Sequence, residues 1–373
     1  MYIGPTKRRA RRWPWLLFLI LLITFGYSYA RSHEQEIKHL LGQERPTPTP
    51  TEISSAEHLA LGDGLFAQGK IDDAAGEYRR TIELDPSNST AYARLGRLLT
   101  LRGRYSEGLH TAQRAVEIDS ENPENQAILG MVLDWNGHYD EAIEACLKAI
   151  DLDPGYATAY AYLAEAFADK GRLERALQVA EQAVSIDVGN AYAHRNLGYV
   201  LERNGDYEGA IDQYIGAIAL QPNLAYLYLS LGRTYRALGD YEGAIAEFQR
   251  AIQVDPHDPT SYDSLGLAFY ALQEYDEAIA EFKEATDADS DFATAYGHLG
   301  WCYYVQRRYE DAIPQLEKAI FLGATTVEFY YELGLSYVYL ADCENARPWL
   351  EDALAIDPDA QPALQGLEIC KDR

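Results

Sequence analysis

A dipeptide of leucine and a small residue returns every 34 residues through most of this chain. Two further series of small residues keep the same spacing, one running from Ala74 to Ala346 and the other from Ala115 to Ala353. This self-similarity restricts the fold more than any local motif, because each period must form the same local structure as the last. The nine dipeptides are Leu61-Gly62, Leu95-Gly96, Leu129-Gly130, Leu163-Ala164, Leu197-Gly198, Leu231-Gly232, Leu265-Gly266, Leu299-Gly300 and Leu333-Gly334.

Each 34-residue unit is predicted to form two helices. When Ser55 is counted as position 1, apolar residues fall at helical spacing over positions 3–14 and again over positions 17–30. Glycine at position 15, as at Gly69, is typical of a left-handed helix end, and proline at position 32, as at Pro86, cannot continue the second helix. Glycine or alanine at positions 8, 20 and 27 lets the helix backbones approach closely. No unit can bury its apolar face alone, so the nine units of residues 55–360 are expected to stack into one solenoid.

These residues resemble the tetratricopeptide repeat family, whose period is 34 residues. The resemblance covers residues 55–373 and implies an all-α, right-handed superhelical solenoid of nine helix-turn-helix repeats. Residues 361–373 begin like a tenth first helix and then stop, so they are expected to form a short capping helix. The family binds extended or helical peptides in its concave groove, and the resemblance implies the same use here.

The N-terminal 30 residues have a different character. Residues 1–12 hold five basic residues and no acid, and no charged residue occurs in residues 13–30. This pattern predicts a transmembrane helix over residues 13–30, with a cytoplasmic N-terminus and an extracytoplasmic repeat body. A signal peptide that is cleaved after residues 28–30 is the alternative, and the body would then be secreted. Residues 31–54, which include alternating Pro and Thr, are expected to form an extended linker.

Charge and motif content exclude several classes of function. The formal net charge is −26, and removing the five positive charges of the head leaves −31 for residues 31–373. A nucleic-acid binder needs a basic surface, so that class is not expected. The sequence has no phosphate-binding loop, nucleophile elbow, catalytic triad pattern or metal-ligand spacing. We therefore expect no enzymatic activity, no cofactor and no metal.

The repeat frame separates the 29 tyrosines into two groups. Seventeen stand at positions 4, 11, 17 and 24, where they are expected to pack within the solenoid. Others stand at positions of the first helix that line the concave groove in proteins of the resembled family. The resemblance implies a peptide-binding groove over repeats four to nine, with these aromatic residues: Tyr162, Tyr192, Tyr199, Tyr226, Tyr270, Trp301, Tyr304, Tyr331 and Tyr339, joined by Trp135 of repeat three.

Four arginines fall on the same lining in repeats five and six: Arg195, Arg203, Arg233 and Arg236. In one interpretation this patch binds an acidic side chain or a terminal carboxylate of the partner, because guanidinium groups bind carboxylates bidentately. In the other, Glu165, Asp169 and Glu202 on the same lining pair with the arginines.

Four cysteines are present. Cys146 and Cys302 replace packing residues and are expected to be buried free thiols. Cys343 begins the last second helix and Cys370 lies in the cap, so an exported body could join them in a disulfide.

The sequence thus predicts a membrane-tethered scaffold that binds a protein or peptide partner. The alternatives are the same scaffold in secreted form, or a structural solenoid that associates with itself.

Overall fold

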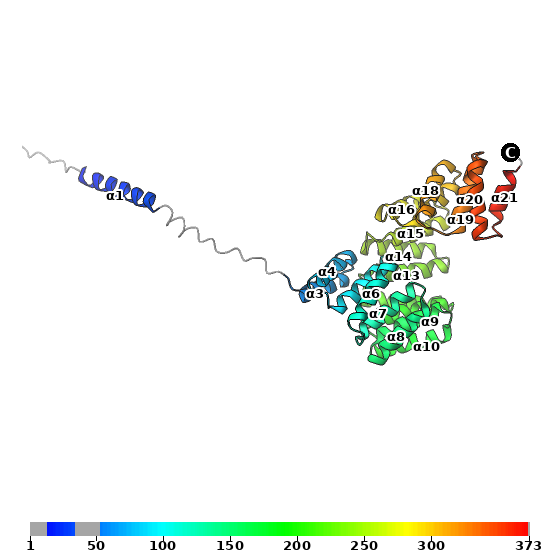
Figure 1. Cartoon of the computed structure of the whole chain (residues 1–373), viewed down its shortest axis with the longest axis horizontal. Helices are drawn as coiled ribbons and strands as arrows, with labels where there is room; N and C mark the ends of the chain where they lie inside the picture. The colour runs from blue at the N-terminus through cyan, green and yellow to red at the C-terminus, as the bar shows by residue number, and fades with distance from the viewer. Residues whose placement is uncertain (1–12, 34–52, 372–373) are drawn as a thin grey trace, which may run out of the picture. The chain divides into compact units, whose positions relative to one another are not determined.

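A computed structural model describes residues 13–33 and 53–371, and these residues form helices and turns without a β-strand (Figure 1). This confirms the all-α prediction. The chain divides into two compact units, residues 1–53 and 54–373. The described helices are α1 (Trp13–Ser32), α3 (Ser55–Ala67), α4 (Ile71–Leu84), α5 (Ser89–Leu101), α6 (Tyr105–Ile118), α7 (Pro123–Trp135), α8 (Tyr139–Leu152), α9 (Ala157–Asp169), α10 (Leu173–Ile186), α11 (Ala191–Arg203), α12 (Tyr207–Leu220), α13 (Ala225–Ala237), α14 (Tyr241–Val254), α15 (Pro259–Ala271), α16 (Tyr275–Ala288), α17 (Ala293–Val305), α18 (Tyr309–Phe321), α19 (Val327–Tyr339), α20 (Cys343–Ile356) and α21 (Gln361–Ile369).

The N-terminal unit contains one described helix, α1. Within the described part of the chain, no helix combines the length and the apolar character that crossing a bilayer requires. The predicted transmembrane helix over residues 13–30 is therefore not supported. The basic head of residues 1–12 and residues 34–52 of the predicted linker lie outside the described residues.

Each repeat is a pair of helices that occupies nearly the positions predicted from its apolar pattern. The first helix covers positions 1–13 and the second begins at position 17. The turn between them has a positive φ at position 15, for example +79° at Gly69, as predicted from the glycine pattern. In the last three repeats this conformation is adopted by non-glycine residues, Gln273, Arg307 and Ala341.

Close packing of the two helices within a repeat depends on the small residue at position 8. A Cβ added at Gly232 would come within 2.5 Å of the Phe248 ring, because the large side chain at position 24 packs directly over the glycine. In repeat four, position 8 is Ala164, and the facing residue is the equally small Ala180; both are fully buried. Positions 8 and 24 of a repeat thus fill the same space between its two helices. This explains why the leucine is followed by a small residue in every unit.

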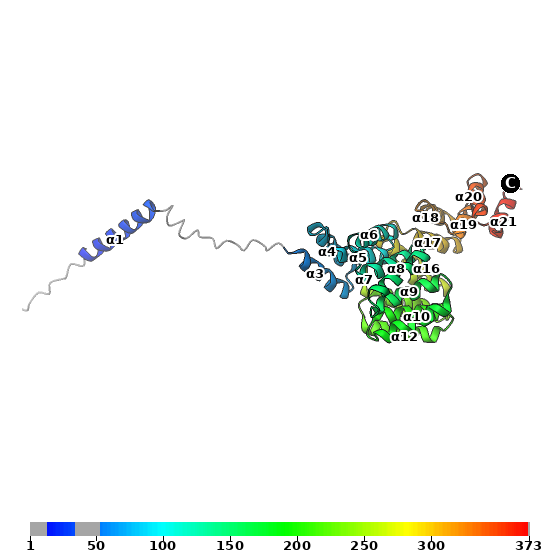
Figure 2. The same ribbon diagram turned by 60° about the horizontal axis from the view of Figure 1, so that its bottom comes forward.

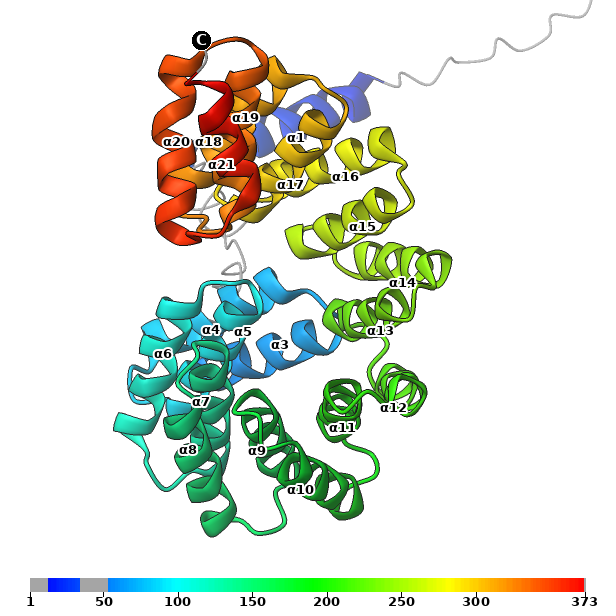
Figure 3. The same ribbon diagram turned by 90° about the vertical axis from the view of Figure 1, so that its right-hand side faces the viewer.

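The first six repeats close into a ring, which the sequence did not predict. Figure 3 shows α3 to α13 following one another around this ring until the two ends meet. At the meeting point Phe66 and Ile71 of repeat one pack in one apolar cluster with Leu224 and Leu227. The Asn223 side chain donates a hydrogen bond of 3.1 Å to the carbonyl oxygen of Ala67.

A buried ion pair also joins the two ends of the ring. Arg102, which follows α5, contacts Asp255 at 2.6 Å and Asp72 at 2.9 Å. The Asp255 side chain is only 6% exposed, so Arg102 is the partner that neutralises a buried charge. Beyond this junction α15 to α21 continue the solenoid away from the ring (Figure 2).

The C-terminal end is held by a disulfide between Cys343 and Cys370, with a Cα–Cα distance of 5.5 Å. It joins the start of α20 to the residue after α21, whose Ala363 is buried in the same cluster as Leu350 and Ala353. Cys146 and Cys302 are buried free thiols, as predicted.

Replacing Cys343 and Cys370 together by serine is expected to destabilise the last repeat by about 3 kcal/mol, because the bond closes a loop 27 residues long. Hydrogen exchange should report the loss as faster exchange in α21 and α20. The ring repeats serve as the internal control, and equal acceleration there would contradict a local role for the disulfide.

Candidate functional site

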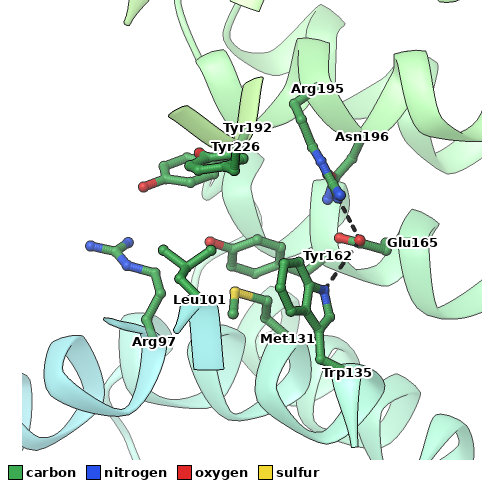
Figure 4. Close-up of a pocket in the computed structure, with 10 residues that line it drawn as sticks. All are labelled: Arg97, Leu101, Met131, Trp135, Tyr162, Glu165, Tyr192, Arg195, Asn196 and Tyr226. Carbon is green, nitrogen blue, oxygen red and sulfur yellow. Dashed lines mark hydrogen bonds and ion pairs between the residues drawn. The ribbon is translucent and has the colours of Figure 1, made fainter. Parts of the chain in front are cut away.

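The centre of the ring is filled by side chains from the first helices of repeats two to six. They line a cavity of about 20 Å³, the size of a single water molecule (Figure 4). Tyr162 is only 3% exposed, and Tyr192, Arg195 and Tyr226 also line this cavity. These four predicted groove residues therefore lie at the centre of the ring, where Tyr162 is buried and the other three are partly buried. The complete lining is Arg97, Leu101, Met131, Trp135, Tyr162, Glu165, Tyr192, Arg195, Asn196 and Tyr226.

Two of the four predicted patch arginines are paired internally. Arg195 forms a buried ion pair with Glu165, which also accepts a hydrogen bond of 3.2 Å from Trp135 Nε1. Arg203 contacts Asp169 at 3.1 Å, and the Tyr199 hydroxyl donates to the same carboxylate. For these two arginines the internal-pairing interpretation holds. Glu202, the third expected acid, instead accepts hydrogen bonds of 3.0 Å from Tyr214 and Thr234.

The other two arginines of the patch, Arg233 and Arg236, form no ion pair with any residue that the structure describes. Burial lowers the pKa of Arg236, and the neighbouring charge of Arg233 lowers it further. Arg233 lines a larger cleft of about 700 Å³, which lies against α13 and the start of α17 and also borders Arg195 and Tyr226. Within the patch, Arg233 and Arg236 are therefore the two arginines without an ion-pair partner among the described residues.

Asp134 on α7 is an ionisable group that the sequence reasoning overlooked. It is 3% exposed, and both carboxylate oxygens are buried without a hydrogen-bond partner among the described residues. Burial, with the negative charges of Glu165 and Asp169, raises the pKa of Asp134 to about 9. The side chain is therefore neutral at physiological pH.

The Asp134 pKa predicts a stability that depends on pH. The folded chain keeps this proton up to about pH 9, whereas the unfolded chain loses it near the ordinary value of 3.8, so stability falls as pH rises between the two. Between pH 5 and pH 8 the wild type should lose about 4 kcal/mol more stability than Asp134→Asn, which cannot titrate. Urea unfolding of both proteins at several pH values measures this difference, and parallel curves would contradict it.

Arg97 on α5 also lies in the ring centre. It stands at position 9, a groove position, but in repeat two, outside the span where the groove was expected. The centroids of the aromatic rings of Phe66 and Tyr192 lie 4.6 and 5.6 Å from its guanidinium carbon. Closure of the ring brings this residue of repeat two together with residues of repeats four to six (Figure 4).

The remaining predicted groove residues form a second group, on α15, α17 and α19 beyond the ring. We call Tyr270, Trp301, Tyr304, Tyr331 and Tyr339 the aromatic strip. The ring centroids of Tyr270 and Trp301 are 6.2 Å apart, and those of Tyr304 and Tyr339 are 6.3 Å apart. Tyr339 is 53% exposed, and the other four are half-buried. Nine of the thirteen predicted residues thus lie either at the ring centre, with four, or in this strip, with five. The other four are Tyr199, Arg203, Arg233 and Arg236.

Matches to family models cover most of the repeat body. Models described as "Tetratricopeptide repeat" match residues 59–123, 187–225 and 264–326, residues 136–197, and residues 327–360, and one described as "TPR repeat" matches residues 232–273. Comparison with curated proteins gives no significant match.

Several solved structures are similar in fold. The Cut9 complex, described as an APC/C hetero-tetramer Cut9–Hcn1, has a TM-score of 0.57 and 17% identity over 90% of this chain and 80% of that one. The human IFIT1 dimer with m7Gppp-AAAA has a TM-score of 0.55 and 17% identity over 85% of this chain and 80% of that one. Pseudomonas aeruginosa PilF has a TM-score of 0.51 and 18% identity over 58% of this chain and 98% of that one. At these identities the likeness concerns the fold alone.

Proposed function

Because the chain belongs to the tetratricopeptide repeat family, we propose that its repeat body is a scaffold that binds a peptide or another protein. Such repeats generally serve as non-catalytic scaffolds, and Cut9, which is similar in fold, was solved together with Hcn1. The observation that carries the proposal is the aromatic strip. Solvent-accessible aromatic side chains that contact one another mark interaction sites, because they bury large areas at low entropic cost.

The chemistry beneath the strip favours a basic residue in the partner. Burial raises the pKa of Glu332 well above its usual range, with a further contribution from the charge of Glu328. Its Oε2 atom has no hydrogen-bond partner among the described residues. A lysine or arginine side chain laid across the aromatic faces would gain cation–π contacts, and its positive charge would lower the pKa of Glu332 and favour the ionised carboxylate as its partner. Arg233 and Arg236 remain available to an acidic residue of the same partner.

The double substitution Tyr304→Ala/Tyr339→Ala is expected to weaken partner binding at least about tenfold, since truncating a central aromatic anchor costs about 2 kcal/mol or more. The partner is first captured in cells with a photo-crosslinking amino acid at position 339 and identified by mass spectrometry. Its affinity for wild type and for the double variant is then measured by calorimetry.

Leu147→Ala is the matched control, because Leu147 is an exposed apolar side chain on α8, away from the strip. It should leave the affinity unchanged. Equal binding by wild type and the strip variant would refute this surface, and crosslinked products containing only this chain would favour the self-associating solenoid.

We also propose that the N-terminal segment directs the repeat body out of the cytoplasm, as a retained anchor or as a cleaved signal peptide. The supporting observations are the five basic residues before an uncharged run and the Cys343–Cys370 disulfide, since such bonds persist in oxidising compartments. Protease added to intact cells should digest an exported body, and complete protection would overturn the orientation.

A further inference from the structure

Arg97 carries a buried positive charge that no described carboxylate neutralises. The residue is 9% exposed, and its Nε atom is buried without a hydrogen-bond partner among the described residues. The nearby Glu124 is already engaged, because its two oxygens accept from Arg94 at 2.9 and 3.1 Å. The aromatic side chains of Phe66 and Tyr192 pack against the guanidinium group but carry no net charge. An uncompensated buried cation costs several kcal/mol, so this arrangement calls for an anion.

Two hydroxyl groups on the same cavity also lack partners. The oxygens of Tyr162 and Tyr226 are buried, and neither forms a hydrogen bond with any residue that the structure describes. Burial raises the pKa of both tyrosines well above the usual value, so both keep their protons and can donate. Figure 4 shows Arg97 and the tyrosines reaching the same part of the cavity from different helices.

The other charges of the cavity are balanced. Arg195 is paired with Glu165, and the neighbouring Asp134 is neutral for the reason given above. The cavity interior therefore has one net positive charge, on Arg97. Its volume of about 20 Å³ has room for a single particle of about the size of water.

We propose that this cavity binds one monovalent anion of the size of chloride, held by Arg97 and by the hydroxyls of Tyr162 and Tyr226. The ligands come from repeats two, four and six, so the anion joins segments that meet only when the ring is closed. Binding to the closed form alone stabilises that form, and the stability of the ring becomes dependent on the anion concentration.

Thermal unfolding of the full chain in chloride and gluconate mixtures of constant ionic strength tests this proposal. Gluconate is monovalent but too large for the cavity. The wild-type Tm should rise as chloride replaces gluconate, and Tyr162→Phe/Tyr226→Phe, which keeps the ring shapes, should need about tenfold more chloride for the same rise. Arg97→Met should show no chloride dependence. Arg347→Met is the matched control, because Arg347 is an exposed arginine on α20, and it should respond like wild type.

Crystals of the wild type grown in bromide provide a readout that does not depend on the stability of any variant. An anomalous peak between the Arg97 guanidinium and the two tyrosine hydroxyls is the expected result. A water molecule with no anomalous signal at that position would overturn the proposal, as would equal Tm values in chloride and gluconate.

Discussion

Replacing Gly69 by alanine is expected to open the ring and to destabilise the repeat body by about 3–5 kcal/mol. Gly69 has φ +79°, and this left-handed conformation costs an L-residue about 1–2 kcal/mol. The larger effect comes from its surroundings, because an added Cβ would overlap the carbonyl oxygen of Asn223 at the ring junction. The backbone of Asn223 must then move, which costs about 1–3 kcal/mol or more.

Gly137→Ala separates the two contributions. Gly137 occupies the same turn position with φ +78°, and its added Cβ meets no atom within 4 Å. It should cost only the conformational term. Urea unfolding compares the stabilities, and small-angle scattering should show expansion for Gly69→Ala alone. Equal losses in the two variants would mean that the junction tolerates the methyl group.

Arg102→Met is expected to cost about 3–5 kcal/mol, the range found when one partner of a buried pair is removed. The substitution keeps most of the apolar stem but leaves the carboxylate of Asp255 buried without its counter-charge.

Arg104→Met provides the control two residues along the chain. Arg104 pairs with Glu107 on the surface, where both side chains are about half exposed, so its removal should cost less than about 1 kcal/mol. A similar loss in Arg102→Met and Arg104→Met would show that the junction contributes no more than a surface pair.

The sequence predicted the local structure of each repeat well. The helix pairs and the turns with positive φ follow from short-range patterns, and nine copies average out irregularities in any one of them. The close approach at position 8 was also predicted, because a glycine or alanine there lets the two helix backbones approach where a larger side chain would separate them. A disulfide between Cys343 and Cys370 was considered from the sequence, because their positions placed both cysteines at the same end of the solenoid.

Closure of the ring could not be predicted in this way. It depends on small rotations between neighbouring repeats, which accumulate over six units and are not encoded in any single one. As a result, the hydroxyl groups of Tyr162 and Tyr226 are buried although both residues stand at groove positions. Arg97 was missed for the same reason, because it belongs to repeat two and reaches its neighbours only across the ring.

The ring junction also has a consequence for the order of synthesis on the ribosome. The apolar residues Phe66 and Ile71 leave the ribosome long before Leu224 and Leu227, which cover them in the folded chain. The ion pair between Arg102 and Asp255 similarly waits for 153 further residues. The first repeat therefore lacks its packing partners while most of the ring is translated. A solenoid held only by contacts between neighbouring repeats could instead pack each repeat as soon as the next one is synthesised.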